Sequence, residues 1–258
     1  AVINYFEGNP LFNAGIGATC TAEGTFELDA SIMEGKDLSA GAVAGLKHVK
    51  HPINAAYAVK TKSPHVMLSG AGAEEFAKEQ GLEMVEDNMY FATPKTMEWI
   101  EKLKQESKKN GTVGCVVLDK QGNLTAGTST GGMFKKRWGR IGDSPVIGAG
   151  TYADNNSCAV SCTGHGEYFI RHAVAFDVCA RYKYLKESVE KAADYIIHTE
   201  LNTNAGNGGF IAVDKLGNIA MPYNSGGMFR GFLYKEKGSP EIKKGCGIGK
   251  KIVVVGEK

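Results

Sequence analysis

Strand-like segments stand out in the middle of the chain by their hydrophobicity. Residues 113–119, VGCVVLD, form an apolar run rich in valine, residues 120–123 carry the turn residues glycine and asparagine, and LTAGTST follows from Leu124. Apolar runs separated by a short turn of this kind are typical of a β-hairpin. The pattern therefore predicts two antiparallel strands that start beside Thr112.

A second copy of this hairpin occurs later in the chain. TVGCVVLDKQGNLTAGTSTGGMF from Thr112 matches NGGFIAVDKLGNIAMPYNSGGMF from Asn207 without a gap. Two copies are too few for a solenoid, but two equivalent hairpins fit two sheets, or two halves of one sheet, packed face to face. Where the first copy has Thr112 and Thr130, the second has Asn207 and Ser225.

Segments with helical spacing surround these strands. Upstream, NAAYAVKTK and GAEEFAKEQG are predicted to be helices around a strand, PHVMLSG, and the charged segment 93–110 is predicted to be a helix. Downstream, an amphipathic helix is expected at about 185–198, after a helix that starts near His165. The apolar face of that earlier helix is predicted to contain Phe169, Ala173, Phe176 and Ala180.

The sharpest change along the chain lies at Gly111–Thr112, where charged sequence gives way to apolar, β-branched sequence. We expect two parts, 1–111 and 112–258, that together make one globular domain. Strands in two groups with helices outside them predict a layered α/β (α+β) arrangement, in which helices cover a sheet sandwich.

Composition narrows the range of partners. Of the 258 residues 43% are hydrophobic, enough for a real core, and the net charge of +2 offers no excess of positive charge to track a nucleic-acid backbone. No apolar run approaches the roughly 20 residues that cross a bilayer, and AVINYFEGNP lacks the features of a signal peptide. Six scattered cysteines without a CxxC pair favour core residues over a metal site. We expect no nucleic-acid or membrane partner and a cytoplasmic location.

Thr112 is the first candidate for catalysis. If the bond after Gly111 is cut, Thr112 gains an α-amine with a pKa of roughly 7.7 to 8.0, which suits a general base for its own hydroxyl. A lone Gly-Thr pair is usually only the start of a strand. The run TSTGG, which returns toward Thr112, favours catalysis, because alternation puts Thr128 and Thr130 on one face and lets one or both hydroxyls reach Thr112.

A loop with opposite charges follows, in KKRWGRIGDSP. Arg140 can grip a carboxylate through two hydrogen bonds and Asp143 can hold an ammonium group, so together they match the head group of an amino acid. The alternative is a local ion pair on the surface.

AVSCTGHGE is predicted to end a strand at Thr163–Gly164 and to start a helix at about His165. A hydroxyl and a backbone N–H at this place suit the stabilisation of an oxyanion. His165 is expected to be a cap or surface residue, because no serine or cysteine nucleophile motif accompanies it.

Eight segments occur in an order that resembles the plant-type L-asparaginases, also called isoaspartyl peptidases or β-aspartyl-peptidases, of the N-terminal-nucleophile hydrolase superfamily. They are NPLFNAGIGA, ELDASIMEG, AGAVAGL, GTVGCVVLD, GNLTAGTSTGGM, GRIGDSP, GAGTYAD and VSCTGHGE. The resemblance implies a four-layer αββα sandwich and the hydrolysis of L-asparagine and β-aspartyl dipeptides. It also implies a homo-oligomer, a dimer of αβ units.

The resemblance assigns roles by position. Thr112 would be the nucleophile freed by autoproteolysis after Gly111, and Thr130 the hydroxyl that assists it. The other site residues would be the oxyanion donors Thr163 and Gly164, Arg140 for the substrate α-carboxylate, Asp143 for its α-amine, and Asn13 and Gly166 lining the same site.

A structural ion is a further implication of the resemblance, whereas catalysis needs no cofactor. Bacterial relatives wrap a sodium ion in backbone carbonyl groups of the NPLFNAG stretch, so a sodium or potassium ion is expected here. A tight glycine-rich loop without an ion is the alternative. The carbonyl groups expected to bind the ion belong to Phe6, Glu7, Asn9, Phe12, Ala14 and Ile16.

The start of this chain differs from the family pattern. Relatives begin with a strand and a long helix, and AVINYFEGNP resembles the end of that helix. Without its first strand the sheet would have an unpaired edge, which IVVVGEK at the other end is apolar enough to fill.

Two alternative functions stay open. The chain could be a glycosylasparaginase, which shares GRIGDSP and TGHGE, or a catalytically silent relative.

Overall fold

A five-stranded sheet in the computed structural model joins segments from both sides of Gly111; the structure describes residues 1–101, 111–235, 242–248 and 253–256. Its order is β3-β2-β1-β5-β4, antiparallel except for β2 and β3. Because β5 pairs with β1, the segments before and after Gly111 share one sheet. The strands are β1 (Leu28–Glu34), β2 (Ala40–Leu46), β3 (Met67–Ser69), β4 (Val113–Leu118) and β5 (Leu124–Thr130).

A four-stranded antiparallel sheet packs face to face against the first. Its order is β6-β7-β8-β9, and β7 contacts both β4 and β5. The two sheets come so close that a Cβ placed on Gly114 would lie 2.2 Å from the Oγ atom of Ser161. Each sheet contains one hairpin of the repeat, so of the two arrangements that the repeat allowed the structure has two separate sheets. The strands are β6 (Thr151–Ala153), β7 (Cys158–Gly164), β8 (Gly208–Asp214) and β9 (Ile219–Ala220).

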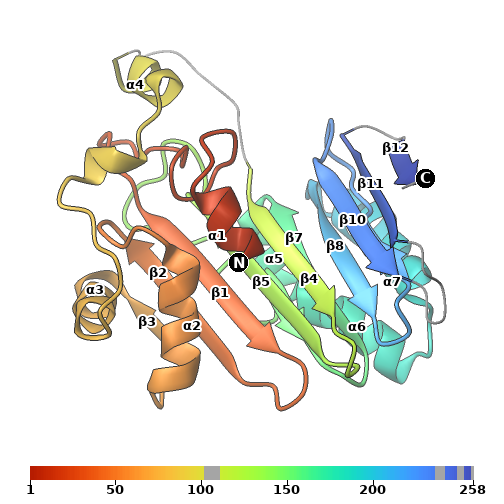
Figure 1. Ribbon diagram of the computed structural model, residues 1–258. Helices are drawn as coiled ribbons and strands as arrows, with labels where there is room; N and C mark the ends of the chain where they lie inside the picture. The colour runs from red at the N-terminus through yellow and green to blue at the C-terminus, as the bar shows by residue number, and fades with distance from the viewer. Residues whose placement is uncertain (102–110, 236–241, 249–252, 257–258) are drawn as a thin grey trace.

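Helices contact the outer face of each sheet (Figure 1). Upstream, the two predicted helices are confirmed as α2 (Pro52–Lys62) and α3 (Gly70–Glu79), with the predicted strand β3 between them. Downstream, α7 (Val189–Tyr195) begins after Ser188, whose hydroxyl accepts a hydrogen bond from the Lys191 N–H. Helices α1 (Val2–Glu7), α2 (Pro52–Lys62) and α3 (Gly70–Glu79) contact the five-stranded sheet. The four-stranded sheet is covered by α5 (Gly166–Arg171), α6 (Val174–Tyr184) and α7 (Val189–Tyr195), which continues as the π-helix η2 (Ile196–Leu201).

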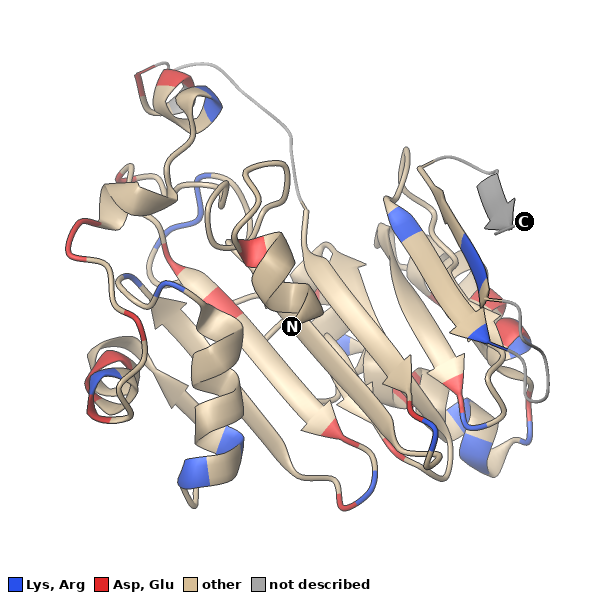
Figure 2. Ribbon diagram, in the orientation of Figure 1, with Lys and Arg blue, Asp and Glu red and all other residues tan. Residues whose placement is uncertain are grey.

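Three hydrophobic clusters fill the spaces between these elements. One lies between the first helices and the five-stranded sheet and includes Phe26 and Leu28, and another lies under α6 and α7 and includes Phe210. The third, with Leu124 and Ala159, lies between the two sheets. Charged residues lie mostly on helices, turns and strand ends, with both signs interspersed in the view of Figure 2.

The helix predicted from His165 is broken into α5 and α6. Ala173 has a left-handed backbone conformation, with φ of 46°, and ends the first helix. The predicted apolar face is therefore wrong beyond the break: Ala173 is exposed and Phe176 is 41% exposed, whereas Val174, Ala175 and Val178 are buried. A prediction that assumes one uninterrupted helical period cannot detect such a break.

Strand β2 has no alternating pattern by which periodicity would reveal it, whereas the alternating polar residues of β1 are buried like its apolar ones. All but one residue of β2, AGAVAGL, is buried, and β1 buries Asp29 and Ser31 beside apolar residues. Such a strand is enclosed on both faces, so the usual contrast between an apolar and a polar face is lost.

The remaining elements lie at the edges of the fold. A three-stranded sheet contains β10 (Arg230–Lys235), β11 (Ile242–Gly247) and β12 (Val253–Gly256). The strand expected in IVVVGEK is thus confirmed as β12, but it pairs with β11 and not with the five-stranded sheet. Of the predicted helix 93–110, the structure has α4 (Pro94–Glu101), preceded by the 3-10 helix η1 (Asn88–Phe91), while 102–110 lie outside the described residues. Within the part of the chain that the structure describes, no helix combines the length and apolar character that a membrane span requires.

Candidate active site

Thr112 lies directly before β4, opposite the end of β5. Val113 pairs with Ser129 in the antiparallel register, which brings Thr112 next to Thr130. The Thr112 hydroxyl donates a hydrogen bond of 3.2 Å to the Thr130 Oγ1 atom. The predicted approach of a hydroxyl from TSTGG to Thr112 is therefore observed, and it is made by Thr130.

Thr128 has a different environment. Its hydroxyl bonds to the hydroxyl groups of Thr151 and, at 2.7 Å, Ser161, both from the other sheet. Ser31 joins the same buried cluster through Thr151 at 2.8 Å. These hydroxyl groups satisfy one another in an otherwise apolar space, so Thr128 connects the two sheets and does not reach Thr112.

The carbonyl oxygen of Gly111 accepts two hydrogen bonds. One comes from the Thr130 hydroxyl at 3.1 Å and the other from the Asn13 side-chain amide at 2.7 Å. Asn13 is itself held by the Thr19 N–H, at 2.8 Å from its Oδ1 atom. Two donors aimed at one carbonyl withdraw electron density from its carbon, which makes this peptide bond more open to nucleophilic attack. Position in the motif had placed Asn13 in the site, but this contact depends on a loop meeting the hairpin in space.

Arg140 forms a bidentate ion pair with Glu167, a residue that the sequence had not singled out. Its Nε atom lies 2.9 Å from Oε1 and its Nη2 atom 3.1 Å from Oε2. This hydrogen bonding lowers the pKa of Glu167 below its usual range. The pair uses one edge of the guanidinium, and the Nη1 end is directed toward Gly142, where a Cβ would lie only 2.7 Å away.

Asp143 is buried, with 5% of its surface exposed, so the alternative of a surface ion pair between Arg140 and Asp143 is wrong. Its Oδ2 atom has no hydrogen-bond partner among the described residues. Desolvation raises the pKa of this carboxyl to about 7, although Arg140 acts in the opposite direction. A buried carboxylate without a partner is costly, and an incoming ammonium group would supply one.

Gly164 and Gly166 allow close approaches at the end of β7. Gly164 has φ of 151°, and a Cβ there would lie 2.5 Å from the Asn207 carbonyl oxygen. A Cβ on Gly166 would lie 2.8 Å from the Arg140 Nη2 atom. His165 occupies the N-cap position of α5, but its side chain forms no capping bond, and its ring stacks on that of Tyr168.

A small cavity brings most of the predicted residues together. Its volume is about 10 Å³, room for about one water molecule, and the Gly111 residue forms part of its wall. Gly164 lines it, whereas Thr163 is not among the described lining residues. The lining consists of Gly111, Thr112, Thr130, Gly132, Met133, Arg140, Gly142, Asp143, Ser144 and Gly164.

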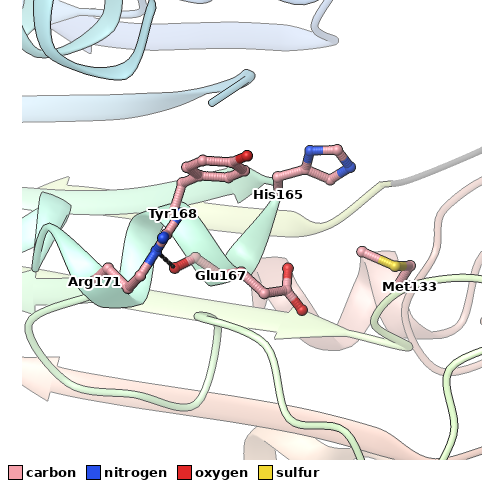
Figure 3. A pocket seen from close by; sticks show the side chains of 5 residues that line it. All are labelled: Met133, His165, Glu167, Tyr168 and Arg171. Atoms are coloured by element: carbon pink, nitrogen blue, oxygen red, sulfur yellow. Dashed lines mark hydrogen bonds between the residues drawn. The ribbon is translucent and has the colours of Figure 1, made fainter. Parts of the chain in front are cut away.

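A larger cavity of about 520 Å³ adjoins the small one (Figure 3). Met133 lines both, and the other walls come from α5 and the residue before it. The lining residues are Met133, His165, Glu167, Tyr168 and Arg171.

The loop after α1, where carbonyl groups were expected to bind an ion, is closed by its own backbone. The carbonyl of Glu7 accepts the Ile16 N–H at 2.8 Å, that of Asn9 the Phe12 N–H at 3.2 Å, and that of Phe6 the Asn9 N–H at 3.1 Å. A Cβ on Gly15 would lie 2.2 Å from the Glu7 carbonyl oxygen. In the parts of the chain for which side chains are described, no cluster of His, Cys, Asp and Glu could hold a metal.

Known proteins resemble the chain over most of its length. A family model described as asparaginase matches residues 1–242. A protein of Salmonella typhimurium named isoaspartyl peptidase is 48% identical over 246 residues, which cover 90% of this chain and 78% of that protein. A protein of Escherichia coli with the same name is 44% identical over 92% of this chain and 81% of its own length. A human protein named isoaspartyl peptidase/L-asparaginase is 41% identical over 86% of this chain and 74% of its own length.

Proposed function

The chain belongs to the asparaginase family, and we propose that it hydrolyses L-asparagine and β-aspartyl dipeptides with the Thr112 hydroxyl, after it has cut itself between Gly111 and Thr112. The observation that carries this proposal is the Gly111 carbonyl. It accepts hydrogen bonds from Thr130 and Asn13, and Thr130 in turn accepts one from the Thr112 hydroxyl.

Self-cleavage follows this chain of hydrogen bonds. The Thr112 oxygen attacks the Gly111 carbonyl carbon while its proton passes to the Thr130 oxygen, and the Thr130 proton passes to the carbonyl oxygen. The five-membered ring so formed opens by breaking the C–N bond, with transfer of the hydroxyl proton to nitrogen, and leaves an ester. This step also frees the α-amine of Thr112. Water then cleaves the ester and releases the Gly111 carboxylate and the Thr112 hydroxyl. Removal of the Gly111 residue then opens the small cavity to a substrate.

In the cut enzyme, the Thr112 hydroxyl attacks the side-chain amide carbon and the Thr112 amine takes its proton. Thr163 and Gly164 stabilise the oxyanion, Arg140 holds the α-carboxylate and Asp143 the α-ammonium. Support comes from the position of Gly164 beside Thr112, from the Nη1 end of Arg140 and from the partnerless Oδ2 atom of Asp143. The leaving amine receives the proton from the Thr112 amine, and water then releases aspartate.

The same family placement leads us to propose a four-layer αββα sandwich. The helices on the outer face of each sheet and the apolar cluster between the sheets support it. The parts 1–111 and 112–258 would stay together after cleavage, because β1 and β5 pair across the cut. We also propose a dimer of such cut units, which the elution volume on gel filtration would test.

A sodium or potassium ion in the loop after α1 is a further part of the proposal. Gly15 and Gly17 let the backbone of the loop pass close to two of the expected oxygens, since a Cβ on them would lie 2.2 Å from the Glu7 and 2.7 Å from the Phe12 carbonyl oxygen. The carbonyl groups of Phe6, Asn9, Ala14 and Ile16 would complete the set. Because an ion that binds only the folded state raises the midpoint of thermal unfolding, sodium chloride should stabilise the protein more than choline chloride at equal ionic strength. Equal midpoints in the two salts would contradict the ion site.

Incubation followed by a three-substrate assay tests the proposed function. The purified chain should give two fragments on a denaturing gel, one starting at Thr112 by N-terminal sequencing. The cut protein should then hydrolyse asparagine and a β-aspartyl dipeptide. A chain that stays whole after long incubation would be the silent relative, and a strong preference for glycosylated asparagine would make it a glycosylasparaginase.

A further inference from the structure

The larger cavity, which shares Met133 with the small cavity at Thr112, contains an arginine whose charged end is available to a ligand. The Nε atom of Arg171 donates to the Glu167 carbonyl oxygen at 3.3 Å, and its guanidinium lies over the Tyr168 ring, 4.6 Å from the centroid. No carboxylate among the described residues forms an ion pair with Arg171. The two terminal nitrogens are thus free to bind a carboxylate through parallel hydrogen bonds, while Nε and the ring fix the orientation of the group.

Tyr168 gives the same cavity an ordered apolar wall. Its ring is stacked with that of His165, with centroids 6.1 Å apart and planes at 25°, and Arg171 covers it as well. In Figure 3 Met133 and Arg171 lie at opposite ends of the group, with Glu167 between them. At about 520 Å³ the cavity has the size that small ligands occupy, and it combines apolar surface with one unpaired cation.

The larger cavity lies where the leaving residue of a β-aspartyl dipeptide could extend from the small cavity. The aspartyl head group would be held by Arg140 and Asp143, in the small cavity, and Met133 forms a wall of both spaces. A dipeptide joined through the β-carboxyl has a second residue beyond the scissile bond. That residue must lie outside the small cavity, and it carries a free carboxylate and a side chain. Asparagine has only an amide nitrogen at this place.

We propose that the larger cavity binds the leaving residue of a β-aspartyl dipeptide, with its carboxylate on Arg171 and an apolar side chain between Tyr168 and Met133. This proposal rests on the proposed function and names the substrates preferred among those it includes. Dipeptides with leucine or phenylalanine as the leaving residue would be favoured over those with glycine. A dipeptide amide, which lacks the carboxylate, would be a poorer substrate than the free acid.

The test compares Arg171→Met with the wild-type enzyme on L-asparagine, β-aspartyl-leucine and β-aspartyl-leucine amide. The wild-type kcat/KM should favour the acid over the amide by about tenfold, the scale of a hydrogen-bonded charge pair, and the variant should lose this preference. Hydrolysis of asparagine should stay within about twofold, because it leaves the cavity empty. Arg137→Met, at an exposed arginine that lines neither cavity, is the matched control and should keep the preference.

A second pair of variants tests the apolar wall. Tyr168→Ala should reduce the preference for β-aspartyl-leucine over β-aspartyl-glycine, whereas Tyr168→Phe should keep it. Cleavage into two fragments shows that each variant has folded. An acid preference that survives in Arg171→Met, or a loss that is equal for asparagine and the dipeptides, overturns the proposal. If the wild-type chain hydrolyses none of the substrates, the proposed function fails and this inference with it.

Discussion

The two hairpins of the sequence repeat have different tasks although they share a turn and a closing GGMF. In the first, β5 is seven residues long and ends with Thr130 in contact with Thr112 and Gly111. In the second, β9 has two residues, and the hydroxyl of Ser225, the equivalent of Thr130, bonds locally to the Gly227 carbonyl at 3.2 Å.

The second hairpin supports the site from the side of β7. The carbonyl of Asn207, the equivalent of Thr112, accepts the His165 N–H at 3.0 Å, and Gly208 pairs with Gly164. The Asn224 side chain in turn accepts the Gly208 N–H at 2.8 Å. The repeat therefore provides the same backbone twice. We expect catalysis only where a hydroxyl contacts a polarised carbonyl group, and five predictions follow from this comparison.

The largest effect is expected at the equivalent positions Thr112 and Asn207. Thr112→Ala removes the attacking hydroxyl, so the chain should stay whole on a denaturing gel and activity should fall by at least about 10⁴-fold. Asn207→Ala keeps the backbone carbonyl that His165 uses, and should be cut and active like the wild type. Cleavage of Thr112→Ala at the same bond would show that another group attacks it.

Thr130 and Ser225 form the next pair. Thr130→Val keeps the shape but removes the hydroxyl that contacts both Thr112 and the Gly111 carbonyl, and should slow cleavage by about 10²- to 10³-fold. The rate is measured from the fraction of whole chain against time. Ser225→Val should cut at the wild-type rate, and Thr130→Ser should recover most of it. Equal slowing by the two valine variants would remove the distinction between the hairpins.

Asp143 follows the first hairpin, whereas the chain after the second GGMF continues into β10. Asp143→Asn should lower kcat/KM by roughly 10²-fold, since a buried ion pair that loses one partner costs about 3 kcal/mol. In the wild type, KM should fall as pH rises through about 7, where Asp143 loses its proton and can pair with the ammonium group. A KM that is constant between pH 6 and 8 would contradict this role.

Loss of the Asp143 proton should improve substrate binding but lower the stability of the fold. The pKa of this carboxyl is higher in the folded chain, about 7 against 3.8, so the folded state holds the proton more tightly. This contribution to the free energy of unfolding is complete below about pH 4 and is lost as pH rises through about 7. Denaturant unfolding tests this in chains that stay uncut. Above pH 7 the double variant Thr112→Ala/Asp143→Asn should therefore be more stable than the single variant Thr112→Ala. A variant that is less stable there would show that Asp143 has a partner when folded.

The smallest effect on catalysis is expected from Asn224 in the second hairpin. Asn224→Ala removes the acceptor for the Gly208 N–H and donors to the carbonyl groups of Gly206 and Ile197, and should lower the free energy of unfolding by about 1–2 kcal/mol. Cleavage and kcat/KM should change by less than about threefold. Asn202→Ala, which removes one partner of Asn224, should cost less stability. Loss of cleavage in Asn224→Ala would mean that the second hairpin does more than support β7.

The sequence by itself determined the elements whose signals are local. The turn in DK-x-GN marks both hairpins, the apolar period marks α2 and α7, and the spacing of Arg140 and Asp143 indicated a site for opposite charges. The register of an antiparallel hairpin also follows from its turn, which is why the approach of Thr130 to Thr112 was predictable.

Only the tertiary structure decided how distant segments complete the site. Asn13 reaches the Gly111 carbonyl across 98 positions of sequence, and Glu167 reaches Arg140 across 27. It also decided that Asp143 is buried and that Thr128 joins the two sheets. Hydrogen bonds and desolvation depend on which surfaces meet in space, and no local period or spacing encodes these contacts.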